Sequence, residues 1–134
     1  MAKLTEILGI DSAHEKSLQQ AGIDSVETLL RVCVRSKQRV QLADRTGISK
    51  TTILEWAHNA DLFRIQAVTY DYANLLRDAG VETVPELSRR NAARLHKRLK
   101  EIHEFKSLAY PLPSEGEVSD WITQARGLPR ILQY

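Results

Sequence analysis

The sequence predicts an all-α fold, and three observations support that prediction. The ten-residue phrase AGIDSVETLL at residues 21–30 returns as AGVETVPELS at residues 79–88, which is 58 positions later. Apolar residues recur three and four positions apart along most of the chain, which is the spacing of a helix face. The stretch between the two copies has almost no alternation of β-branched residues, so it does not favour strands. We therefore expect one compact domain, residues 1–134, of about ten short helices.

Two repeats account for the recurring phrase, and we place them at residues 4–34 and 62–90. When the copies are set in register, apolar positions coincide while polar ones differ, as when Ile7 meets Ile65. Apolar positions that coincide between the two copies indicate that both copies pack in the same way. Each repeat should contain a short helix, a tight turn, a second helix, a glycine stop and a third helix.

The repeated phrase encodes the end of one helix and the start of the next. Gly22 and Gly80 should each end a helix in the left-handed backbone conformation that glycine adopts most easily. Ser25 can then cap the following helix in the first copy. In the second copy, Thr83 and Glu86 match the capping box, in which a hydroxyl and a carboxylate cover orphan amides.

A helical insert at residues 36–60 separates the repeats, with Gly47 as a helix stop and Ser49 as a cap. This segment also fits a helix-turn-helix pattern, whose recognition helix would begin at Ser49. The charged side chains that this helix could present to DNA bases are one cation, Lys50, and one carboxylate, Glu55. A helix with so little positive charge is poorly suited to bind a polyanion. We therefore favour simple helix packing for the insert.

Two further helices should follow the second repeat. Residues 91–106 form a basic helix whose apolar face consists of Ala92, Leu95, Leu99 and Ile102. The prolines of the stretch YPLPS then break that helix and favour extended backbone. Residues 114–127 form a C-terminal helix, expected to dock as a lid, whose apolar positions are Val118, Trp121, Ile122 and Ala125.

Composition and cysteine content restrict the class of protein. Hydrophobic residues make up 43% of the 134 residues and charged residues 27%, as in ordinary globular domains. No apolar run approaches the roughly 18 residues of a membrane span, and the N-terminus lacks the apolar core of a secretory signal. The single cysteine, Cys33, lies between two valines and is expected to be buried. We expect a cytoplasmic protein without membrane contact.

Charge is distributed unevenly, although the net charge is only +2. Residues 31–50 and residues 89–106 each carry a net charge of +5, so the remainder is acidic. Cations on the solvent side of the basic helix could follow a phosphate backbone without reading base sequence. The candidate nucleic-acid-binding residues are Arg89, Arg90, Arg94, Lys97, Arg98, Lys100, Arg39 and Lys50. The simpler alternative is a solvated helix face, the ordinary state of charged faces.

No catalytic or metal-binding pattern accompanies these cations. The sequence has no glycine-rich phosphate loop followed by Lys-Ser/Thr, no nucleophile elbow and no His-Glu-x-x-His motif. We therefore expect no enzyme activity, no cofactor, no metal and no small-molecule substrate. His96 and His103 share a helix ridge without further ligands and are expected to be surface histidines. Among the other aromatic residues, Tyr70 is the expected exposed contact, and the expected inward-facing ones are Trp56, Trp121 and Tyr72.

The segment LTEILGIDSAHEKSLQQAGIDSVETLL resembles a helix-hairpin-helix unit, the small motif of many DNA-repair and recombination proteins. More closely, the chain resembles a bacterial family of domains of unknown function built on tandem helix-hairpin-helix-like units. That resemblance runs through LADRTGIS, ILEWAHNADLFRI, AGVETVPELSRRN and EVSDWITQARGLPRILQY, and it covers nearly the whole chain. It implies two helix-hairpin-helix-like (SAM-like) repeats, with the helical insert between them and the C-terminal lid helix at the end.

In helix-hairpin-helix proteins that bind DNA, two hairpin glycines let backbone amides approach a phosphate. The first copy keeps Gly9 and Ile10 of that pattern, so their backbone is the candidate hairpin contact. Asp11 stands where the second glycine belongs, and the second copy, AVT at residues 67–69, has neither glycine. Both hairpins also lie in acidic segments, which weakens the hairpin-to-phosphate mechanism.

The resemblance and the basic blocks together predict a non-enzymatic domain that binds double-stranded DNA through its phosphates, without sequence specificity. The alternative is a module for protein–protein interaction or self-association. The missing hairpin glycines favour that alternative, as do the acidic hairpins, which would suit a basic partner surface.

Overall fold

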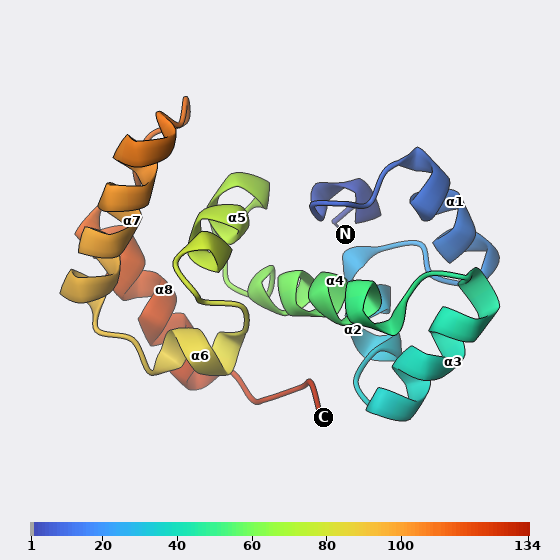
Figure 1. Ribbon diagram of the computed structural model, residues 1–134. Coiled ribbons are helices and arrows are strands. Elements are labelled where there is room, and N and C mark those ends of the chain that lie inside the picture. Colours follow the sequence, from blue (N-terminus) through green and yellow to red (C-terminus); the bar gives the residue numbers. More distant parts are fainter. Residues whose placement is uncertain (1) are drawn as a thin grey trace. The chain divides into compact units, whose positions relative to one another are not determined.

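The computed structural model describes residues 2–134, and their backbone is helical throughout its regular parts (Figure 1). The elements are one 3-10 helix, η1 (Leu4–Glu6), and eight α-helices. The α-helices are α1 (Ser12–Gln20), α2 (Val26–Val32), α3 (Ser36–Thr46), α4 (Lys50–Leu62), α5 (Tyr70–Asp78), α6 (Val84–Ser88), α7 (Ala92–Lys106) and α8 (Glu115–Gly127). The described part of the chain contains no strand, so the predicted all-α class is confirmed.

Backbone contacts divide the chain into two compact units. Unit 1 comprises the chain up to Asp61 together with Ile131–Tyr134, and unit 2 comprises Leu62–Arg130. Each unit holds one copy of the repeated phrase and one of the two tryptophans, Trp56 in unit 1 and Trp121 in unit 2. The single domain over residues 1–134 stays a prediction.

The turn that precedes the repeated phrase has the same geometry in both copies. In unit 1 the amide of Ile10 donates to the carbonyl of Ile7 at 3.2 Å. In unit 2 the amide of Val68 donates to the carbonyl of Ile65, also at 3.2 Å. These four residues occupy matching positions 58 residues apart, so the shared apolar pattern does correspond to a shared local backbone.

Gly9 and Ala67 occupy the same position in these two turns, with φ of +93° and +72°. A Cβ on Gly9 would also lie 3.3 Å from Nε1 of Trp56. We expect Gly9→Ala to lower the free energy of unfolding by about 1–2 kcal/mol, because left-handed backbone penalises a side chain. Ala67→Gly should raise it by about 0.5 kcal/mol, since glycine relieves that strain but loses more backbone entropy on folding. Urea unfolding of both variants tests this, and a loss of stability in Ala67→Gly would contradict it.

The predicted helix stops are present at both copies. Gly22 and Gly80 each have φ of +87°, in the left-handed region where glycine is favoured. The Thr83 hydroxyl caps α6 by accepting from the amide of Glu86 at 3.4 Å. The Glu86 carboxylate accepts from the amide of Glu82 at 2.9 Å. It therefore covers an amide one residue before the one that the capping box predicts.

The helix stop and the helix cap predicted inside the insert are both present. Gly47 stops α3 with φ of +75°, and the Ser49 hydroxyl caps α4 by accepting from the amide of Thr52 at 3.1 Å. Trp56 lies inside α4 and is buried, as expected of a core residue. The cysteine prediction is likewise confirmed, since Cys33 is fully buried.

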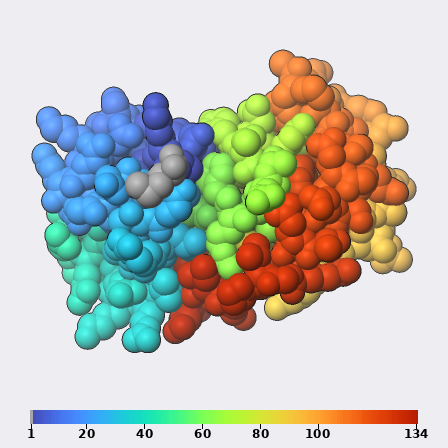
Figure 2. All heavy atoms as spheres, turned by 180° about the vertical axis from the view of Figure 1, so that it is seen from behind, coloured from blue at the N-terminus to red at the C-terminus, as the bar shows by residue number. Residues whose placement is uncertain are grey.

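Residues 131–134 belong to the packing of unit 1, which the sequence had not indicated. Leu132 is buried, and the amide of Gln133 donates to the carbonyl of Val34 at 2.7 Å. The Tyr134 hydroxyl lies 2.9 Å from Nε2 of His58. Figure 2 shows the red end of the chain beside the cyan segment that includes the start of α3. The final residues are therefore part of the structure of unit 1.

The core of unit 2 lies between α8 and its neighbours. Helix α8 contacts both α6 and α7, and α7 also contacts α5. The apolar residues of the lid helix are all buried: Val118, Trp121, Ile122 and Ala125. Ser114 and Glu117 form a capping box, with bonds of 3.0 and 3.2 Å between each side chain and the other's amide. The lid helix thus begins and ends where the sequence predicts.

Two histidines hold the loop between α7 and α8. Nε2 of His103 lies 2.6 Å from the carbonyl of Tyr110, and Nε2 of His96 lies 3.0 Å from the carbonyl of Pro113. Both imidazoles are half-buried, which corrects the expectation of surface histidines. The physical reason is that this loop has no helical partners for its carbonyls, so side chains of α7 supply the donors.

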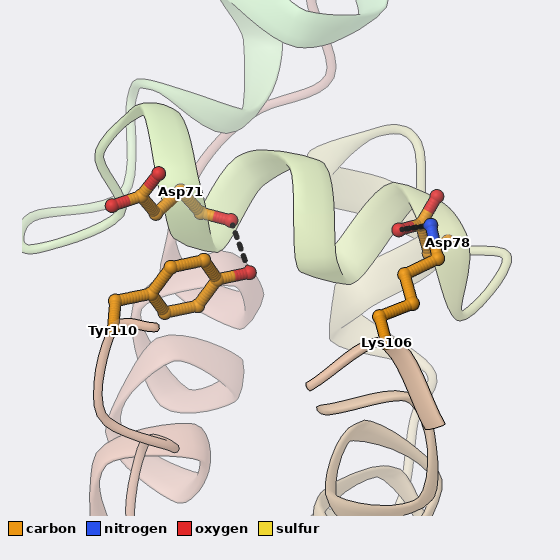
Figure 3. A network of polar contacts seen from close by, with 4 residues as sticks. All are labelled: Asp71, Asp78, Lys106 and Tyr110. Atoms are coloured by element: carbon orange, nitrogen blue, oxygen red, sulfur yellow. Dashed lines mark hydrogen bonds and ion pairs between the residues drawn. The ribbon is translucent and has the colours of Figure 1, made fainter. Parts of the chain in front are cut away.

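Both ends of α5 are bonded to the end of α7 or to the loop that follows it (Figure 3). The Tyr110 hydroxyl donates to the carbonyl of Asp71 at 3.3 Å, near the start of α5. At the other end, Nζ of Lys106 lies 2.7 Å from the carboxylate of Asp78. Tyr72 turns inward as predicted, with its ring centre 5.3 Å from that of Trp121. These contacts give α7 a defined position beside α5.

Candidate nucleic-acid interface

The candidate interface is the exposed side of α7. The opposite side of the helix is anchored by three buried residues, Leu95, Leu99 and Ile102. Its first turn is capped by Asn91, whose side-chain oxygen accepts from the amide of Arg94 at 3.1 Å. Because one face is fixed in the core, the residues of the other face are presented at regular helical positions. The helix runs from residue 92 to 106, within one residue of the predicted basic helix.

Four cations lie on this exposed side: Arg94, Lys97, Arg98 and Lys100. Within the described residues, Arg98 pairs weakly with Glu101 at 3.5 Å, while the other three make no ion pair. No neighbouring carboxylate among the described residues holds those three, and the Arg98–Glu101 pair is long and exposed to solvent, so all four cations are available to phosphate oxygens. Arg94 and Arg98 are four residues apart and Lys97 is three from Arg94, so they share one side of the helix.

Arg89 and Arg90 are not part of the helical row. Arg89 is the C-terminal cap of α6, and its side chain is exposed. Arg90 lies in the connection between α6 and α7, and its guanidinium donates to the carbonyl of Gly80 at 3.3 Å. Asn91 caps the start of α7 and the two arginines precede it, so these two candidate residues lie outside the helix that carries the other four.

Arg39 is buried, at 5% exposure, which corrects its assignment to an exposed basic surface. Its guanidinium donates to the carbonyls of Cys33 at 2.8 Å, Val34 at 3.2 Å and Gln133 at 2.9 Å. It also lies 5.6 Å from the ring centre of Tyr134. Because the guanidinium is already bonded to three carbonyls and lies near the Tyr134 ring, it is not available to a phosphate.

Lys50 is exposed at the first residue of α4. It borders a cavity of about 270 Å³, which Val40, Leu54 and Tyr134 also line. This cavity lies in unit 1, whereas the α7 cations lie in unit 2. The structure thus gives no reason to join Lys50 with the α7 row.

The first hairpin has little capacity for an anion. The amide of Ile10 is already bonded to the carbonyl of Ile7. The carboxylate of Asp11 accepts from the amide of His14 at 2.9 Å, and this hydrogen bond to the charged form is the main cause that keeps the pKa of Asp11 below its usual value. Asp11 therefore places a negative charge where a phosphate would bind. Of the predicted hairpin contacts, Gly9 stays exposed and Ile10 is buried.

Phe105 is the feature of this surface that sequence reasoning missed. It is 90% exposed, more than any other large hydrophobic side chain among residues 2–134. It borders a cleft of about 490 Å³, whose other lining residues are Asp78, Arg98, Glu101, Ile102 and Lys106. The signal was present in the sequence, because residue 105 falls outside the apolar spacing of Leu95, Leu99 and Ile102.

Comparison with known proteins places the chain in a family. The model of the family described as "Domain of unknown function (DUF4332)" matches residues 8–128, which is most of the chain. This chain belongs to that family. The comparisons with curated proteins and with solved structures gave no match. Membership of DUF4332 agrees with the resemblance to a family of domains of unknown function seen in the sequence.

Three further properties of the described residues concern the thiol, metal binding and membrane spans. Burial raises the pKa of the Cys33 thiol to about 12, partly offset by the charge of Arg39, so the thiol stays protonated. Among residues 2–134, no group of three His, Cys, Asp or Glu side chains could hold a metal ion. None of the helices in that range has both the length and the apolar character needed to cross a membrane.

Proposed function

We propose that this DUF4332 chain is a non-enzymatic domain that binds nucleic acid through phosphate contacts with α7. The observation that carries the proposal is the row of exposed cations on a helix whose other face is fixed in the core of unit 2. Contacts of this kind depend on charge and position, not on base identity. The binding should therefore be insensitive to sequence.

The turns in the two repeats support an interpretation as degenerate helix-hairpin-helix-like units. Both turns have a residue with positive φ at the same position and the same hydrogen bond across the turn. In each, the amide that follows this residue is bonded within the chain. The contact with phosphate is accordingly assigned to α7, and the hairpins are assigned a structural role.

The test is fluorescence anisotropy with a short DNA at several salt concentrations. Four phosphate contacts predict a slope of about −3.5 for log affinity against log salt, so the affinity should fall about 100-fold between about 50 and 200 mM. The double variant Arg94→Glu/Lys97→Glu should bind at least tenfold more weakly at low salt. Its slope should be about 2 smaller in magnitude, because two phosphate contacts are lost.

A matched control separates this site from the effect of net charge. Lys3 and Lys16 are exposed in unit 1, and Lys3→Glu/Lys16→Glu changes the net charge by the same amount. We expect this control to retain most of the affinity and the full salt slope. Equal losses in both double variants would reject α7 as the site, and no binding at low salt would reject the function.

A second candidate function is interaction with another protein. The observation that favours it is Leu8, which is 46% exposed in the turn of the first hairpin beside the acidic cap Asp11. An exposed apolar residue close in sequence to a carboxylate suits a protein surface better than a phosphate. Self-association in sedimentation velocity that Leu8→Ser abolishes, together with no binding of DNA, would favour this function.

A further inference from the structure

The cleft beside Phe105 has the composition of a site for a planar ring. Ile102 forms an apolar lining, and the exposed ring of Phe105 lies at the border. The volume of about 490 Å³ lies within the range of small-molecule sites. A single exposed apolar residue would mean little by itself, but here it adjoins both a cleft and a row of cations.

The carboxylates of the cleft are already paired with cations. Lys106 lies 2.7 Å from Asp78, and Figure 3 shows this pair joining the end of α5 to the end of α7. Arg98 lies 3.5 Å from Glu101. Because each carboxylate has a neighbouring cation, the cleft offers hydrogen-bond acceptors without an excess of negative charge. Acceptors of this kind suit the amino groups and ring N–H groups of a nucleobase.

Phe105 also continues the row of phosphate-binding candidates. Arg94, Arg98 and Phe105 are separated by four and seven residues, so they lie along the same side of α7. A strand whose phosphates follow Arg94 and Arg98 would therefore bring its next base to Phe105. Cations that follow a backbone, beside an aromatic ring, are the common arrangement in proteins that bind single strands.

We propose that the Phe105 cleft binds one unpaired nucleobase, so that this DUF4332 chain prefers single-stranded over double-stranded nucleic acid. The inference rests on the proposed function, since the phosphates must be held by α7. A base in a duplex is stacked on both faces and cannot lie against Phe105, whereas an unpaired base can. This inference differs from the expected partner, double-stranded DNA, and the comparison of the two DNA forms decides between them.

The test compares a mixed-sequence single strand of about 16 nucleotides with its duplex, using the full chain at about 50 mM salt. We expect tighter binding of the single strand. Phe105→Ala should weaken single-strand binding about tenfold, because base stacking is lost. It should leave duplex affinity and the salt slope unchanged, since the cations remain. Phe105→Trp should retain the single-strand affinity.

Tyr70→Ala is the matched control. Tyr70 is exposed in unit 2, as predicted for a contact residue, but it lies at the opposite end of α5 from Asp78 and does not line the cleft. Tyr70→Ala should change neither the single-strand affinity nor the duplex affinity. Equal binding of both DNA forms, unaffected by Phe105→Ala, would overturn this inference and leave the phosphate-binding function standing. Absence of binding to either form would overturn both. Self-association that Phe105→Ala abolishes, without DNA binding, would assign Phe105 to a protein contact and also overturn the inference.

Discussion

Arg39→Met is expected to lower the free energy of unfolding by about 3 kcal/mol. Methionine replaces much of the aliphatic part of arginine, so the packing loss is small. The guanidinium, however, bonds three backbone carbonyls inside unit 1, those of Cys33, Val34 and Gln133. Without it, buried or half-buried acceptors lose a charged donor, and each such loss costs about 1 kcal/mol or more.

The loss of stability in Arg39→Met should affect unit 1, and the stability of unit 1 can be measured because each unit contains one tryptophan. In a Trp121→Phe background, Trp56 is the only tryptophan and reports on unit 1. In that background, urea unfolding followed by the fluorescence of Trp56 should show the lower free energy of unfolding of Arg39→Met. Arg45→Ala removes an exposed arginine from the same helix and should cost no more than about 1 kcal/mol, the usual value of a cation near a helix C-terminus. Equal effects of both substitutions would show that the guanidinium contacts contribute little.

The ends of the helices could be predicted because they depend on local chemistry. Asn91 and Ser114 each accept a backbone hydrogen bond from the residue three positions later, and each precedes a helix that starts at the next residue. Gly47 ends α3 in the left-handed conformation. These signals involve neighbours within four residues, so the sequence displays them directly.

The role of Arg39 could not be predicted because its partners are distant in the sequence. One of its acceptors, Gln133, is 94 residues away. A count of positive charges gives Arg39 the same weight as Arg35 or Lys37, although only Arg39 of the three is buried. The roles of His96 and His103 were missed for a related reason. Their carbonyl partners lie in a loop whose path depends on the docking of α8.

The candidate site was predicted in part. The helical row Arg94, Lys97, Arg98 and Lys100 is exposed as expected, because the apolar spacing of α7 fixes which side faces the core. The cleft beside Phe105 was not foreseen, since it needs the end of α5 next to the end of α7. The binding of nucleic acid by either feature stays a prediction.

Trp121→Ala is expected to lower the free energy of unfolding by about 4 kcal/mol. The indole is 1% exposed in α8 and lies against the ring of Tyr72. Removing it leaves a large cavity where α8 packs on α6 and α7, so the core of unit 2 loses its largest fully buried side chain. Helical circular dichroism during urea unfolding measures the loss, and Trp121→Phe should restore more than half of the lost stability.

Phe105→Ala provides the matched comparison, because it removes an aromatic ring that is exposed, in the same unit. Its stability should change by no more than about 0.5 kcal/mol, as for most surface substitutions. Trp121→Ala should weaken every DNA contact, since the anchored face of α7 loses its support, whereas Phe105→Ala should weaken only single-strand binding. If Phe105→Ala destabilised the protein as much as Trp121→Ala, Phe105 would be a packing residue, and its exposure could not be used as evidence for a base-binding cleft.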